Sequence, residues 1–310
     1  MFHAKETTDI ALRLRSASVG LLLIACCGCT MHDGGAAGGS SGGASENSAA
    51  PKIVSAAEMR LPIEQYMFTN SQRGRIVEAK EKVIELCVQR FGLTYEPSEQ
   101  SRSFQPETLT ALRYGITSES DAADYGYRPA GSEGSTAPVK PKPVTKEVKM
   151  LLKGTTVAGE YRGRTVPEGG CIGESRRALQ DTEKDGGGGD AEVSNKINAN
   201  SWQLSYQDKR VRVVFNKWAH CMQRAGHHYA DPMEANNDPR WRKTASATSD
   251  EKKVAVADAR CKKAYNVVGT WYASDRAYQE RMIKEHSAEL KSVREKIKRQ
   301  TRLATSIVDD

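Results

Sequence analysis

The sequence lacks any apolar run long enough to cross a lipid bilayer. Its most apolar stretch, residues 17–25, falls well short of the roughly 20 residues that a spanning helix needs. Aromatic residues make up only 6% of the chain, and no basic stripe is interleaved with aromatics that would stack on bases. We therefore expect neither a bundle of membrane-spanning helices nor a nucleic-acid partner.

Recognisable catalytic motifs are also missing. The chain has no Gly-x-Ser-x-Gly elbow between a strand and a helix, no phosphate-binding loop and no dinucleotide fingerprint. Ser249 and Lys252 match a Ser-x-x-Lys pattern, but the partner motifs Ser-Asp-Asn and Lys-Thr-Gly are absent, so a helix start explains these residues better. We expect no cofactor and assign no catalytic residue.

The N-terminus has the features of an export signal. A basic segment with Lys5, Arg13 and Arg15 precedes the apolar residues 17–25. The segment ends in Leu-Ile-Ala-Cys, which resembles a bacterial lipobox, and on that resemblance Cys26 carries the lipid. Two alternatives remain open: acylation at Cys29, and an ordinary cleaved signal peptide whose cysteines are incidental.

We divide the chain into a lipoprotein signal peptide at 1–29, a flexible Gly/Ser-rich tether at 30–52 and an extracytoplasmic domain at 53–310, with 53–190 and 200–310 as candidate halves. Such a tether reaches about 25 Å on average. The acylated cysteine would hold the domain on the outer face of the cell membrane. The 46 basic and 39 acidic residues give a net charge of +7, a bias that suits an anionic membrane or wall polymer.

Two stretches of the domain share the pattern Cys-x-Gln-Arg-x-Gly-x-x-Tyr, at 87–95 and at 221–229. Each follows an amphipathic segment, so we interpret each as the last turn of a helix. The cysteine faces inward, the arginine suits the helix dipole, and the glycine takes the left-handed conformation that ends the helix. Chance is the alternative explanation for the match, because the loops that follow differ greatly in length.

Seven cysteines are present, and three of them, Cys26, Cys27 and Cys29, belong to the signal and tether junction. The other four lie in the domain, at Cys87, Cys171, Cys221 and Cys261. An even number in an exported chain argues for two disulfides, and four cysteines allow three pairings. The repeated pattern favours Cys87–Cys171 and Cys221–Cys261.

Helical patterns dominate the domain, and we expect a mostly α fold with long loops, two disulfides and a long C-terminal amphipathic helix. Capping-box spacing at Thr69 and at Thr248 marks two helix starts, the second helix being broken near Gly269. The residues from Ser205 to Gly226 have the clearest apolar stripe. A heptad pattern that includes His286 predicts one helix over about 272–305. Residues 148–152 fit either a short helix or a strand.

Candidate ligands for a metal gather in one region, at His220, His227, His228, Asp231 and Glu234. Neither His-x-x-x-His nor Cys-x-x-Cys spacing occurs there, so a polar loop is the better interpretation and we assign no metal. A glycosidase would need two carboxylates that converge. Glu58, Glu64, Glu168 and Glu174 are candidates, with Glu168 and Glu174 the least implausible pair.

Several segments resemble a group of actinobacterial secreted lipoproteins of uncharacterised activity. The residues that carry the resemblance are the lipobox, Cys221-Met222-x-x-x-Gly226-x-x-Tyr229, Asp231-Pro232, Asp238-Pro239-Arg240-Trp241, Ala255-Val256-Ala257-Asp258-x-x-Cys261-Lys262, Tyr278-Gln279, Arg113-Tyr114-Gly115-Ile116 and Tyr125-Gly126-Tyr127. The resemblance implies export and a lipid anchor, and it implies no activity. We expect a non-catalytic module that binds an unknown protein or cell-wall ligand; the alternative is a cell-envelope hydrolase that uses dispersed carboxylates.

Overall fold

The computed structural model describes residues 50–53, 59–97, 106, 108–130, 143–154, 159–181 and 189–310. The predicted signal peptide, lipobox and most of the tether lie outside these ranges, as do Glu58 and most of the glycine-rich stretch 185–190. Residues from Ala49 to Asp310 form one compact unit. In the described part of the chain, no helix is both long and apolar enough to cross a membrane.

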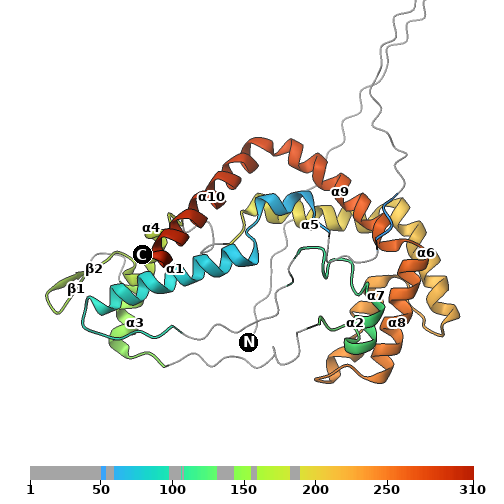
Figure 1. The fold of residues 1–310 in the computed structure, drawn as a ribbon, viewed down its shortest axis with the longest axis horizontal. Coiled ribbons are helices and arrows are strands. Elements are labelled where there is room, and N and C mark those ends of the chain that lie inside the picture. The colour runs from blue at the N-terminus through green and yellow to red at the C-terminus, as the bar shows by residue number, and fades with distance from the viewer. Residues whose placement is uncertain are drawn as a thin grey trace, which may run out of the picture. The chain divides into compact units, whose positions relative to one another are not determined.

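The fold is mostly helical, as expected (Figure 1). The α-helices are α1 (Asn70–Gln89), α2 (Glu119–Tyr125), α3 (Lys146–Lys153), α4 (Gly170–Ala178), α5 (Glu192–Gln207), α6 (Lys209–Arg224), α7 (Pro232–Asn236), α8 (Ser249–Ala264), α9 (Val267–Glu285) and α10 (Ser287–Asp309). The described residues also include two 3-10 helices, η2 (Pro62–Tyr66) before α1 and η4 (Pro239–Lys243) between α7 and α8. An antiparallel hairpin, β1 (Gly159–Tyr161) and β2 (Arg164–Val166), pairs Glu160 with Thr165.

The main core lies where α5, α6, α8 and α9 pack on one another and on η2. Its centre is aromatic: Trp271 contacts Trp202, Tyr206 and Phe215, with ring centroids 5.0–5.7 Å apart. Trp218 and Phe215, which the sequence places on the inward stripe of α6, are fully buried. Packing, rather than exposed recognition, therefore accounts for these large side chains.

α10 packs lengthwise along α1, and α1 also contacts α3 and α4 (Figure 1). Leu290, Val293 and Ile297 are buried, as the heptad pattern predicts. The C-terminal helix is therefore docked on the compact unit.

Both predicted disulfides are confirmed, Cys87–Cys171 and Cys221–Cys261. The first joins α1 to α4 inside a second, smaller core that includes Val88, Phe91, Val148 and Leu151. The second joins α6 to α8 beside the main core. Each bridge thus clamps two helices that also share apolar contacts.

The interpretation of the repeated pattern is confirmed at both helix ends. α1 ends at Gln89 and α6 at Arg224, and Gly92 and Gly226 follow with φ angles of 70° and 84°. Thr69 caps α1 through the predicted reciprocal box with Gln72. Such sequence signals predict helix ends because the unpaired backbone N–H and C=O groups there must find hydrogen-bond partners among neighbouring residues.

Four local predictions need correction or completion. Gly269 does not break a helix: α8 ends at Ala264, and Gly269 is buried inside α9, where an added Cβ would lie 1.9 Å from the carbonyl oxygen of Pro51. The predicted helix at 272–305 is two helices, with an exposed His286 at their junction. Thr248 caps α8, but the Glu251 carboxylate accepts from the Tyr127 amide instead of closing the box. Residues 148–152 are helical, within α3.

Candidate functional site

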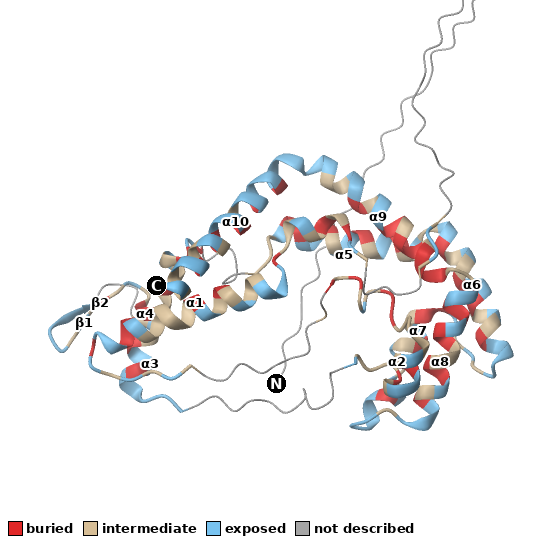
Figure 2. Cartoon of the chain, in the orientation of Figure 1, coloured by how far each residue is buried: buried red, intermediate tan, exposed pale blue. Residues whose placement is uncertain are grey.

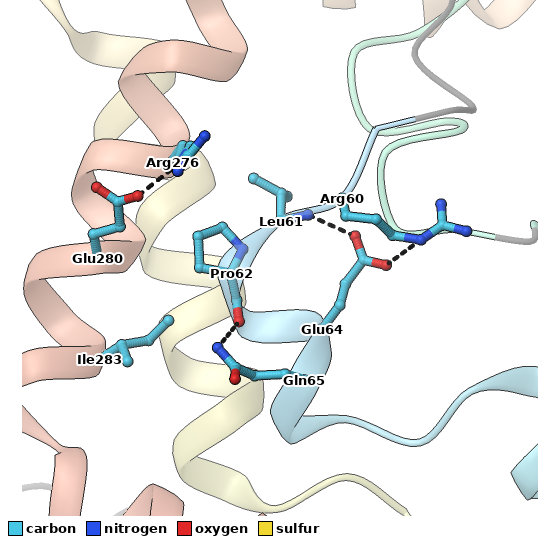
Figure 3. A pocket seen from close by; sticks show the side chains of 8 residues that line it. All are labelled: Arg60, Leu61, Pro62, Glu64, Gln65, Arg276, Glu280 and Ile283. Carbon is cyan, nitrogen blue, oxygen red and sulfur yellow. Dashed lines mark hydrogen bonds and ion pairs between the residues drawn. The ribbon is translucent and has the colours of Figure 1, made fainter.

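A pocket lies between η2 and the second half of α9 (Figure 3). It has a volume of about 680 Å³, which falls within the range of small-molecule sites. Its lining combines apolar and charged groups: Arg60, Leu61, Pro62, Glu64, Gln65, Arg276, Glu280 and Ile283. Pro62 and Ile283, which are partly exposed, supply the apolar surface, Leu61 is buried behind it, and four charged side chains lie around it.

Side chains of α9 hold the η2 wall of this pocket in place. The Gln279 side-chain oxygen accepts a hydrogen bond of 3.0 Å from the Ile63 amide, and its nitrogen donates to Ser201 on α5. The Tyr272 hydroxyl donates to the carbonyl oxygen of Arg60 at 2.8 Å. Gln279 is fully buried, so the pocket wall is fixed by contacts made in the core.

The charges of the pocket are balanced within each wall. Glu64 accepts from the Leu61 amide at 2.8 Å and lies 3.7 Å from Arg60, while Glu280 accepts from Arg276 at 2.8 Å. Figure 3 shows each carboxylate turned towards the arginine of its own wall rather than towards the other carboxylate. Burial raises the pKa of Glu64, and the Leu61 amide and Arg60 oppose that rise.

The described carboxylates among those proposed for glycoside hydrolysis lie apart from one another, and Glu58 is outside the described residues. Glu64 lines the η2–α9 pocket without Glu168 or Glu174. Glu174 forms an ion pair with Arg90, close to the Cys87–Cys171 bridge. Glu168 is exposed in the turn before α4, and its carbonyl oxygen accepts from Arg177. Of the three candidates that the structure describes, Glu64, Glu168 and Glu174, no two share a cavity.

The histidine-rich region also forms a hollow, of about 540 Å³, lined by His227, His228, Tyr229, Glu234, Asp238 and Arg240 among others. Its acidic groups already serve the protein: Glu234 accepts from the Ala230 amide at 2.6 Å, and Asp238 caps η4. Arg240 holds the pKa of Asp238 at about 2. Among the described residues, no three metal-binding side chains come close enough to hold an ion.

His220 and Asp231 do not line that hollow. His220 is exposed on α6, whereas Asp231 caps α7 and accepts a hydrogen bond of 2.5 Å from the Tyr206 hydroxyl. Burial lowers the pKa of His227, with smaller effects from Arg240 and His228. The predicted polar loop thus contains two short helices whose acidic residues act as caps.

Two buried ion pairs were not predicted from the sequence. Arg113 and Asp275 meet at 2.5 Å, with 8% and 0% of their side chains exposed. Asp258 and Lys262 meet at 3.0 Å within α8, with 0% and 1% exposed. The sequence contains a signal for the second pair: the two residues are four apart on the inward stripe of α8, where an apolar residue would be expected.

Most polar atoms of these two pairs have partners. The Arg113 guanidinium also donates to the side chain and the carbonyl oxygen of Asn198 and to Ser201, and Tyr114 donates to Asp275 at 3.0 Å. Trp218 donates to Asp258 at 2.8 Å, and Lys262 donates to the carbonyl oxygen of Ile116. The pairs tie the segment 108–118 to α5, α8 and α9, which is a structural role.

A scan against protein-family models, a search of curated proteins and a search of solved structures found no match to this chain.

Proposed function

We propose that this chain is a lipid-anchored extracytoplasmic protein that binds a protein or cell-wall ligand in the pocket between η2 and α9. The lipobox-like sequence at Cys26 and the glycine-serine tract motivate the location. The two disulfides support an oxidising compartment, because such bridges are rare in reducing ones.

The observation that carries the binding role is the mixed character of the pocket. Apolar surface from Pro62 and Ile283 supplies contact area, and the paired charges beside it orient the polar groups of a ligand. Gln279 and Tyr272 fix the η2 wall before any ligand arrives, so little ordering entropy is lost on binding.

The alternative is hydrolysis by Glu64 and Glu280, and one observation favours it. Both carboxylates line the same pocket, and burial raises the pKa of Glu64, as is common for a general acid. Against this, Glu280 is 53% exposed and bound to Arg276, and Glu64 is bound to Arg60 and to the Leu61 amide. A carboxylate in such a pair is neither a free nucleophile nor a convergent base.

Site-specific photo-cross-linking in intact cells distinguishes these roles. A photoreactive residue replaces Ile283 in the pocket, and in a matched control it replaces Val213, an apolar residue of α6 that is 53% exposed. We expect a discrete cross-linked product from position 283, absent from position 213 and weaker in the double variant Glu64→Gln, Glu280→Gln, which removes two of the charges that orient the ligand. Identical products from both positions would refute binding in the pocket, and a product that accumulates only in the double variant would favour hydrolysis.

A further inference from the structure

A row of cations runs along the exposed face of α10. Lys291, Arg294, Lys298 and Arg302 are spaced i, i+3, i+7 and i+11, and all four are exposed. Figure 2 shows that much of the length of α10 is exposed. At about 100° and 1.5 Å per residue, they lie within an arc of about 80° and extend over roughly 16 Å. Arg299, also exposed, flanks the row.

This face accounts for more than half of the chain's excess positive charge. The row and Arg299 contribute five cations, and Glu295 is the acidic residue among them, so the face carries 5 − 1 = 4 charges out of a net +7. The helix dipole does not explain the row, because Arg302 lies well before the end of α10 at Asp309.

A single acidic residue, Glu295, serves this face. Among the described residues, Lys298 pairs with Glu295 at 3.0 Å, and Arg294 and Arg302 also lower the pKa of that carboxyl from farther away. One carboxylate among five cations leaves the face positive. The neighbouring helix behaves differently: on α1, Arg73 pairs with Asp190, Arg75 with Asp309 and Lys80 with Asp181. Like charges at i+3 and i+4 repel each other, and the single carboxylate of Glu295 offsets only part of that repulsion, so a bound anion would stabilise the helix further.

The shape of the row indicates the kind of anion. The apolar face of α10, with Leu290, Val293 and Ile297, is already buried, so this helix has no apolar stripe to insert into a bilayer. The cations follow one another in single file, with rises of about 4.5–6 Å between neighbours. A linear polyanion laid along the helix can contact all of them. A flat anionic surface is matched better by cations that are spread over a broad area.

We infer that the exposed face of α10 binds a linear phosphate polymer of the cell envelope, such as a polyol phosphate with one charge per repeat. The inference rests on the proposed extracytoplasmic location, and it adds a second surface, formed by α10, to the η2–α9 pocket. The interaction is electrostatic: its strength depends on how many cations of the row the phosphates neutralise, and not on a close fit at any one residue.

The test uses the full chain, kept unacylated by Cys26→Ser and Cys29→Ser, with labelled poly(glycerol phosphate) and fluorescence anisotropy. One variant replaces Lys291, Arg294, Lys298 and Arg302 by Gln. The control replaces four other exposed cations, Lys209, Lys217, Lys243 and Lys284, by Gln, so its net charge falls by the same amount. Both variants are compared by circular dichroism to verify their helix content.

The expected salt dependence follows from counterion release. We assume five phosphate contacts and the slope per contact that is typical of a flexible single strand. The logarithm of the binding constant then falls with a slope of about −3.5 against the logarithm of the salt concentration. The affinity is therefore about a hundredfold weaker at 200 mM salt than at 50 mM. The row variant should keep a slope of about −0.7, and the control should resemble the parent protein.

Equal losses in the two variants would overturn the inference, because net charge alone would then explain binding. The inference would also be overturned if the protein did not bind the polymer but bound anionic vesicles more tightly than neutral ones, and if that preference were lost in the row variant. The ligand of the row would then be a membrane surface. Failure of polymer binding leaves the Ile283 cross-link unaffected, so it is distinguishable from failure of the proposed pocket.

Discussion

The buried pair of Arg113 and Asp275 gives the sharpest prediction about stability. Asp275 is fully buried and accepts from Arg113 and from the Tyr114 hydroxyl. The substitution Asp275→Ala leaves the guanidinium inside the protein with no counter-ion. Removing one partner of a buried pair costs about 3–5 kcal/mol of the free energy of unfolding, because the remaining charge stays desolvated.

The adjacent pair Arg276–Glu280 supplies a matched control. It lies on the same helix at a similar distance, 2.8 Å, but its side chains are 55% and 53% exposed. Exposed pairs contribute about 0–1 kcal/mol, so Glu280→Ala should be nearly neutral. Urea unfolding followed by tryptophan fluorescence measures both variants, since Trp202 and Trp271 lie in the core that the pair supports.

The double variant Arg113→Met, Asp275→Leu completes the test. It removes both charges and leaves apolar groups, so it should recover part of the loss caused by Asp275→Ala. If Asp275→Ala costs no more than Glu280→Ala, the buried pair does not hold segment 108–118 on α9, and the reasoning is wrong.

Further predictions concern the covalent and backbone features of the fold. Replacing either cysteine pair by serine should lower the free energy of unfolding by about 4 kcal/mol, since the bridges close loops separated by 84 and 40 residues; thermal melts with and without reductant check this. Cys26→Ser should abolish incorporation of a labelled fatty acid while Cys29→Ser retains it, as seen on a gel. Gly269→Ala should destabilise the unit because the new Cβ meets the Pro51 carbonyl, and a lower melting temperature reports it. Arginines hold the pKa values of Asp208 and Asp238 at about 2, below the usual 3.8. The two carboxylates therefore contribute to the free energy of unfolding above pH 3.8, and this contribution is lost as the pH falls towards 2. Replacing both by Asn should reduce the loss of stability in acid.

Helix ends and cysteines were the predictable part of this fold. A cap such as Thr69 acts on backbone groups within a few residues, so its pattern survives in the sequence whatever the tertiary context. The pairing of Cys87 with Cys171 was predicted because each half of the domain has one cysteine at the end of a helix and a second cysteine later, at or inside another helix. The helix ends and the disulfides could therefore be predicted from residues that are close together in the sequence.

Helix α5 was overlooked for a physical reason. Its buried face contains serines as well as apolar residues, at Val193, Ile197, Ser201 and Ser205. Ser205 accepts from the Trp271 ring nitrogen, and Ser201 accepts from Gln279, so the serines are satisfied by residues far along the chain. A search for apolar periodicity does not detect a face whose burial depends on such distant partners.

The candidate pocket depended on distant residues in the same way. Leu61 and Ile283 lie at opposite ends of the described domain, and only the packing of η2 on α9 brings them together. The motifs that carry the resemblance, such as Asp231-Pro232 and Asp258-x-x-x-Lys262, proved to be caps and buried pairs. Their patterns reflect how the helices are held, so they gave no indication of the binding surface.

The intact mass of the mature protein, purified from membranes and treated with a thiol-alkylating reagent without prior reduction, tests the central claim most directly. An extracytoplasmic lipoprotein predicts a chain that starts at Cys26, carries acyl groups on that residue and shows no alkylation at Cys87, Cys171, Cys221 or Cys261. An unacylated chain, or one whose four domain cysteines all react, would contradict it.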